Sequence, residues 1–130
     1  MSRSIIQDEE GTCYICSHYC GDRSFKRGLE KHHIFGGPLR KKSEHYGLWV
    51  TLCRKHHTGD IDGSGSAVHR PDRNDYSLRL KYTAQKRFER HYGIKEFRKA
   101  YKGGDWKEHL EEVDRMGHAL FMQEFGRNWT

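Results

Sequence analysis

The chain has 130 residues, of which 34% are hydrophobic and 32% are charged, and its formal net charge is +6. This length suits one domain and leaves room for an appended helical segment, and the apolar content is low for a core of that size. A bound metal ion would therefore add useful stability. The positive charge favours a polyanionic partner, with nucleic acid ahead of a membrane surface. No apolar run in the sequence approaches the length that spans a bilayer.

Residues 1–11 are expected to form a flexible leader, and they lack the apolar stretch of a signal peptide. A cytoplasmic, reducing location is therefore the default expectation. In that setting, closely spaced cysteines indicate metal binding or redox chemistry rather than a disulfide framework.

Three cysteines and one histidine have the spacing of a structural zinc site. Two residues separate Cys13 from Cys16, and two separate Cys53 from His56. Thiolate and imidazole are the ligands that zinc prefers in closed tetrahedral sites. The sequence therefore predicts a Cys3His site for Zn²⁺. Cys20 is left over; it could substitute for one of these ligands, but we expect it to be a free cysteine.

Four further histidines indicate a second, open metal site: His32, His33, His57 and His69. A catalytic metal needs a few protein ligands and at least one open position. Imidazole also titrates near neutral pH, so one histidine can act as a general base. Adjacent side chains on a regular strand point to opposite faces, so His32 and His33 must lie at a strand end to act on one substrate.

The first half of the chain favours short strands. Residues 29–34 and 48–52 are expected to be strands, and the glycine–proline run at 36–38 must form a turn. Residues 39–44 are expected to be a basic loop. A helix should begin near Arg54.

Basic residues flank the predicted histidine site on both sides. They are candidate contacts to backbone phosphates, although a run of charge is more often a solvated face. The candidates are Arg40, Lys41, Lys42, Arg54 and Lys55. The glycine-rich run at 58–66 is expected to be a loop, and 67–69 a short extended piece.

The pattern becomes helical after residue 75. Apolar residues at i, i+4 spacing predict a helix over 77–92 that ends at Gly93. A second, short helix is expected over 94–101. Asp105 is the expected N-cap of a third helix that ends near Gly126.

The motifs resemble the HNH family of nucleases, which have a ββα-metal active site on a treble-clef zinc knuckle. The resemblance covers residues 12–70 and rests on Cys-x-x-Cys, His-His-Ile and Cys-x-x-His-His in the family's order. More closely, the chain is similar to small HNH-like proteins of phages and prophages. These share the His-His-Ile-Phe-Gly-Gly segment at 32–37 and the Phe-Gly-Arg-Asn-Trp tail at 125–129.

The resemblance implies an α+β fold with a zinc-bound ββα-metal core and a C-terminal helical extension. The core would occupy residues 12–75 and the extension residues 76–130. It also implies that His32 and His57 bind the catalytic metal and that His33 is the general base. Mg²⁺, Mn²⁺, Ni²⁺ and Zn²⁺ all suit such a site.

The resemblance leaves two positions open. A further metal ligand often lies beyond the last motif, and His69 is our candidate, with Asp60 or Asp62 behind it. The middle asparagine of the family is absent before the second predicted strand, where His45 or Ser43 are possible substitutes.

The implied activity is metal-dependent endonuclease cleavage of nucleic acid, with double-stranded DNA as the expected partner. A phage- or prophage-encoded protein would act in the cytoplasm of a bacterial host. The main alternative is a non-catalytic zinc-finger DNA-binding or recombination-accessory protein. A redox or zinc sensor is a second alternative, but no thioredoxin-like pattern surrounds the first cysteine pair. A protein–protein adaptor role for the C-terminal helices could coexist with any of these.

Overall fold

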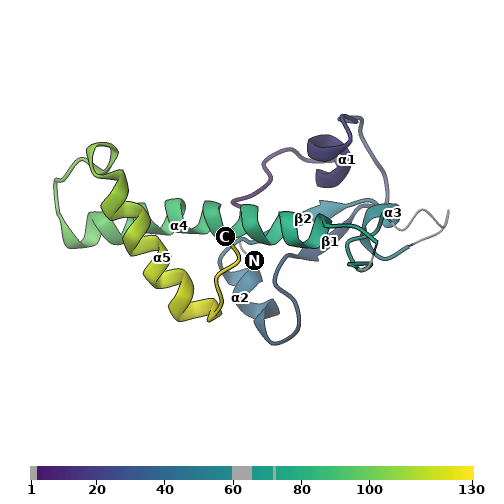
Figure 1. The fold of residues 1–130 in the computed structure, drawn as a ribbon. Helices are drawn as coiled ribbons and strands as arrows, with labels where there is room; N and C mark the ends of the chain where they lie inside the picture. The colour runs from purple at the N-terminus through teal and green to yellow at the C-terminus, as the bar shows by residue number, and fades with distance from the viewer. Residues whose placement is uncertain (1–2, 60–65, 72) are drawn as a thin grey trace. The chain divides into compact units, whose positions relative to one another are not determined.

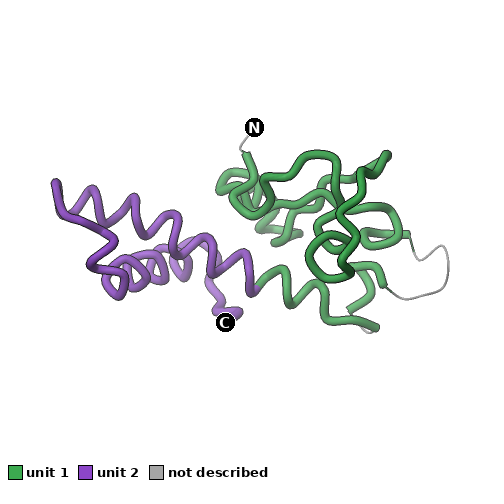
Figure 2. The backbone as a smooth tube through the Cα atoms, turned by 90° about the horizontal axis from the view of Figure 1, so that it is seen from above, with its two compact units in different colours: residues 1–81 green, residues 82–130 purple. Residues whose placement is uncertain are grey.

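The computed structural model describes residues 3–59, 66–71 and 73–130. The chain divides into two compact units, Met1–Lys81 and Tyr82–Thr130 (Figure 2). The fold is mixed α+β, as the sequence predicted. Within the described residues, we find no helix with both the length and the apolar character needed to cross a membrane.

The first unit contains a two-stranded antiparallel sheet. Strand β1 is Glu30–His33 and strand β2 is Trp49–Leu52 (Figure 1). Val50 and Leu52 are fully buried, whereas Trp49 and Thr51 are half-buried. This alternation places one face of β2 in the core, as the β-branched and aromatic sequence predicted.

Three short helices accompany the sheet. These are α1 (Tyr14–Tyr19), α2 (Arg40–His45) and α3 (Arg54–His57), and the 3-10 turn η1 (Gly37–Leu39) precedes α2. Helix α3 begins where the sequence predicted a helix. Helix α2 replaces the predicted basic loop over residues 39–44. A six-residue helix completes too few turns to show an apolar period, so the pattern could not reveal it.

The segment that the sequence predicted as a flexible leader is tied to β2 over residues 3–11. The Ser4 hydroxyl donates a hydrogen bond to the Trp49 carbonyl at 2.6 Å, and the Thr51 amide donates to the Gln7 side chain at 2.8 Å. These partners are more than forty residues away in the sequence, so no local pattern could have indicated them.

The second unit is helical. Helix α4 (Tyr76–Ala100) enters it from the first unit, and the turn η2 (Trp106–Glu108) and helix α5 (Leu110–Phe125) follow. Asp105 caps η2 by accepting a hydrogen bond from the Lys107 amide at 3.0 Å. Gly126 ends α5 with a φ of 71°, as predicted.

The prediction of two helices over 77–92 and 94–101 is wrong, because α4 continues through Gly93. Gly93 is a packing residue rather than a helix terminator. A Cβ there would lie 2.2 Å from the Val113 carbonyl oxygen in α5. Only glycine therefore allows the two helices to approach so closely.

A second glycine, Gly117, allows a test of this packing, because the direction of the stability change shows whether the site is closely packed. A Cβ at Gly117 would lie 1.8 Å from the Glu89 carbonyl oxygen. Alanine at an exposed helix position would stabilise the protein by about 1 kcal/mol. Because the backbone must shift here, we expect Gly117→Ala to lower the free energy of unfolding by about 1–3 kcal/mol, as measured by urea denaturation. Exposed Ala119→Gly is the control and should lose only about 1 kcal/mol through helix propensity. A stabilised Gly117→Ala protein would contradict the close packing.

The C-terminal tail is held by a buried amide on α4. Gln85 is fully buried, and its Oε1 accepts a hydrogen bond from the Trp129 amide at 2.6 Å. Its Nε2 donates to Asn128 Oδ1 at 2.7 Å and to Glu89 Oε2 at 2.9 Å. The tail motif noted in the sequence thus supplies partners for a side chain that would be costly to bury alone.

Candidate metal centres and the adjoining cavity

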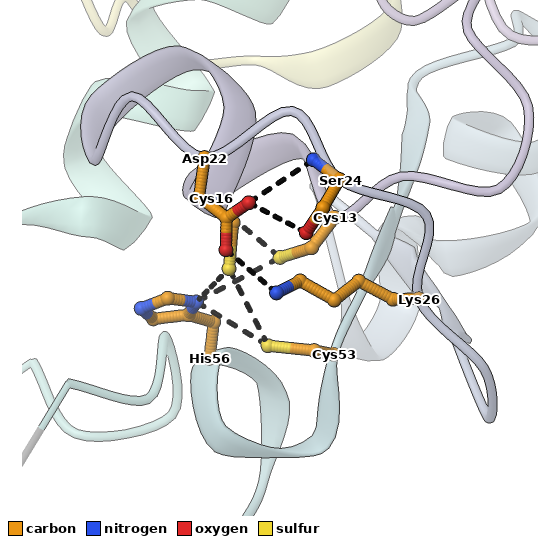
Figure 3. Close-up of polar contacts among 7 residues, drawn as sticks. All are labelled: Cys13, Cys16, Asp22, Ser24, Lys26, Cys53 and His56. Carbon is orange, nitrogen blue, oxygen red and sulfur yellow. Dashed lines mark hydrogen bonds and ion pairs between the residues drawn. The ribbon is translucent and has the colours of Figure 1, made fainter.

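The four predicted structural ligands converge in the first unit (Figure 3). Cys16 Sγ lies 3.8 Å from Cys53 Sγ, and His56 Nδ1 lies 3.7, 3.3 and 3.4 Å from the sulfurs of Cys13, Cys16 and Cys53. A tetrahedral ion with metal–sulfur bonds of about 2.3 Å has sulfur–sulfur edges of about 3.8 Å. The cluster can therefore hold a metal ion such as zinc.

Each ligand pair lies where a short helix begins. Cys13 caps α1 and Cys53 caps α3. The Cys16 amide donates to Cys13 Sγ at 3.5 Å, and the His56 amide donates to the Cys53 carbonyl at 3.1 Å. These turns aim both members of each pair at one point. Burial is the main cause that raises the pKa of Cys13 and of Cys16, so a bound cation would be needed to keep both as thiolates.

A lysine faces the sulfur cluster. Lys26 Nζ donates a hydrogen bond to Asp22 Oδ2 at 2.7 Å, and Figure 3 shows the ammonium directed toward the sulfurs. Asp22 is the main cause that raises the pKa of Lys26, and the charges of Cys16 and Cys53 act in the same direction. Three thiolates and a divalent ion carry a net negative charge, which this ammonium would offset.

The second group consists of His32, His57 and His69. One ligand nitrogen from each lies within 4.8 Å of the others. Tetrahedral bonds of about 2.0–2.1 Å would need nitrogen–nitrogen edges of about 3.3 Å, so binding would draw the rings somewhat closer. Three imidazoles suit a metal that keeps an open position for a further ligand.

Two backbone hydrogen bonds bring His69 to this group. His32 lies on β1 and His57 is the last residue of α3. The Val68 amide donates to the His56 carbonyl at 2.8 Å, and the His69 amide donates to the His57 carbonyl at 3.4 Å. The turn at 67–69, predicted as extended, is thereby fixed against α3.

Asp60 and Asp62, which the sequence offered as alternative ligands, lie outside the described residues.

Burial lowers the pKa of His32 and of His69 and so favours their neutral rings. His32 is 8% exposed, and burial, followed by the charges of His57 and His69, lowers its pKa to about 3. A neutral ring keeps the lone pair that a metal needs. Glu30, which was not among the predicted site residues, places its Oε1 3.1 Å from His57 Nδ1. A proton on that nitrogen would leave His57 Nε2 for the metal. The strand period, which places Glu30 and His32 on one face, was the available signal.

His33, the last residue of β1, does not belong to the group. Its Nε2 lies 3.0 Å from Glu44 Oε1 on α2, whereas His32 contacts His57 and His69. Nevertheless, His32 and His33 both line one cavity of about 660 Å³ at the end of the strand.

The same cavity is basic. Lys31, Arg40 and Lys81 line it, and none of its lining residues within the described part of the chain is acidic. Lys81 was not among the predicted contacts, because no pattern within its own helix indicates that it borders the histidines. The other candidate phosphate contacts are exposed and lie outside this lining: Lys41, Lys42, Arg54 and Lys55. An anion entering the cavity would therefore meet both imidazoles and cations.

Ser43, one of the two candidate substitutes for the asparagine, makes two buried hydrogen bonds near the strand ends. It is fully buried, its hydroxyl donates to the Leu48 carbonyl at 2.5 Å, and it accepts from the Phe35 amide at 3.2 Å. His45, the other candidate substitute, is exposed. Ser43 thus connects α2 with the ends of both strands.

Cys20 stands apart from the sulfur cluster. It is exposed, and its Sγ lies 4.0 Å from the Tyr76 hydroxyl.

No protein-family model, curated protein or solved structure matches the chain in the comparisons. The function of the chain is therefore inferred from the contacts and the cavity described above.

Proposed function

We propose that this chain is a metal-dependent HNH-type endonuclease that hydrolyses phosphodiester bonds, with double-stranded DNA as its substrate. One observation carries the proposal. Three imidazoles that can hold a metal share a basic cavity with a fourth histidine, His33, that lies outside their group. Metal-assisted hydrolysis of a phosphodiester uses a metal with open coordination positions and a separate base that accepts the proton of the attacking water.

In this proposal, His33 takes a proton from a water molecule as the water oxygen forms a bond to phosphorus. The bond from phosphorus to the 3′ oxygen then breaks. A divalent ion held by His32, His57 and His69 would act as a Lewis acid for the charge on the phosphate and the leaving oxygen. Lys31, Arg40 and Lys81 border the cavity and would hold the negatively charged substrate.

The Cys3His cluster has a structural role in the same proposal. Zinc bound there would complete a treble-clef knuckle and fix α3, which carries His57. Ser43 would hold the loop that the family holds with its middle asparagine. The bound zinc ion and the buried Ser43 hydroxyl would then both stabilise the fold around the proposed active site.

Nicking of supercoiled plasmid tests the proposed activity. Protein freed of loosely held metal should convert plasmid to the open-circular form when Mg²⁺, Mn²⁺, Ni²⁺ or Zn²⁺ is added. Excess chelator should stop the reaction. If the protein binds DNA but never cuts it with any of these ions, the non-catalytic DNA-binding alternative takes the place of the nuclease.

The salt dependence of DNA binding tests the basic surface of α2. Each phosphate contact contributes a slope of about −0.9 in log affinity against log salt. Replacing Arg40, Lys41 and Lys42 together with glutamine should therefore make the slope shallower by up to about 3. Fluorescence anisotropy of a labelled duplex across a salt series measures it. An unchanged slope would remove α2 from the interface.

A further inference from the structure

Glu44 connects α2 to β1 through one carboxylate oxygen. Its Oε1 accepts a hydrogen bond from Lys31 Nζ at 2.5 Å and lies 3.0 Å from His33 Nε2. Its Oε2 is buried and has no hydrogen-bond partner among the described residues. Lys31 and His33 are two residues apart on β1, so the strand period presents both to the same carboxylate.

The carboxylate is ionised at neutral pH. Its hydrogen bonds, first from Lys31 and then from His33, lower the pKa of Glu44 to about 2. An ionised carboxylate can only accept hydrogen bonds. The nitrogen of His33 that faces it must therefore carry a proton.

We infer that Glu44 is a positioning residue that fixes the His33 ring with the proton of the tautomer on Nε2, so that Nδ1 is the nitrogen left as acceptor. The ring of a neutral histidine carries one proton, on Nδ1 or on Nε2. The hydrogen-bond partners of the two nitrogens decide which of them carries it. The consequence for catalysis rests on the proposed function, whereas the tautomer itself does not.

Lys31 holds the carboxylate in place for this role. Its Nζ lies 4.1 Å from the centre of the Trp49 ring, which faces it from the paired strand. A cation in that position is attracted to the ring face and to the carboxylate at once. Glu44 is thereby fixed on one side by Lys31, and His33 is the second group that it contacts.

Nitrogen-15 NMR of the imidazoles tests the tautomer directly. The His33 signals can be assigned by their absence in His33→Ala, and in the parent they should report a proton on Nε2. Glu44→Leu should shift His33 toward the other tautomer or a mixture, because the acceptor is gone. Lys31→Met removes the ion pair that helps to fix Glu44 but leaves the acceptor for His33, so the parental tautomer should remain the major one.

Two NMR results would overturn the inference. One is a proton on Nδ1 in the parent, which needs no variant to observe. The other is a parental tautomer that persists in Glu44→Leu. Glu44→Gln retains an acceptor oxygen without the charge, so it should restore the parental tautomer even if the leucine variant folds poorly.

Cleavage kinetics test whether positioning reaches the reaction. Glu44→Leu should lower kcat by about tenfold to a hundredfold with KM unchanged, the effect expected of a group that orients a catalytic side chain. Glu9→Gln is the control, because Glu9 lies 3.5 Å from His18 in a similar pair outside the cavity. An unchanged kcat in Glu44→Leu would overturn the inference. If the parent does not cut DNA, the proposed function fails, and the NMR result still decides the role of Glu44.

Discussion

Cys53→Ser is expected to give insoluble or largely unfolded protein without structural zinc. The substitution removes one of four converging ligands. Binding of a structural zinc ion contributes about 10–16 kcal/mol of apparent free energy, much of which becomes folding free energy. A chain that is only 34% hydrophobic has little core to compensate for such a loss. Zinc content by elemental analysis and thermal unfolding by circular dichroism measure the outcome.

Cys20→Ser is the matched control for that experiment. Cys20 is exposed and lies outside the cluster, so the variant should keep both its zinc and its melting temperature. A Cys53→Ser protein with parental melting behaviour and no zinc would rule out the structural site.

His33→Ala should abolish most cleavage without affecting the fold. His33 belongs to neither ligand group, so the variant should retain structural zinc. It should also bind DNA as well as the parent, because a general base acts mainly in the transition state. We expect a loss of roughly a hundredfold or more in the rate of plasmid nicking, the usual size of a general-base contribution.

His57→Ala should also lose cleavage, but for a different reason. His57 is one of three imidazoles that can hold the second metal, so its loss should weaken metal binding. Excess metal should therefore restore part of the activity of His57→Ala and none of that of His33→Ala. A metal titration of the nicking rate compares the two variants with the parent. Rescue of His33→Ala instead of His57→Ala would reverse the assignment of base and ligand.

The spacing of residues in the sequence predicted those contacts that form between residues only a few positions apart. Cys13 and Cys16 converge because a single turn joins them, and the same is true of Cys53 and His56. Identical logic could not place His69, which reaches its partners through backbone hydrogen bonds that follow from the tertiary fold. The sequence therefore indicated His69 as a candidate but not the position of its ring beside His32 and His57.

The misses share a physical cause. Glu30 and Lys81 act through position relative to another element. The strand period puts Glu30 on the face of His32, but no pattern within either segment reports the contact with His57 or with the cavity. Gly93 was taken as a helix end because glycine is common there. Its actual role depends on the approach of Val113, a contact that only the packed structure contains.

A single peptide bond joins the sulfur cluster to the imidazole group. His56 belongs to the sulfur cluster and His57 to the imidazole group, although they are neighbours on a four-residue helix. Successive helical residues differ in direction by about 100°. An insertion of a single residue between them would leave the Cys53–His56 pair intact but turn His57 away from its partners. The length of this one turn therefore sets how the two groups of side chains are oriented relative to each other, and changes in length are best tolerated elsewhere.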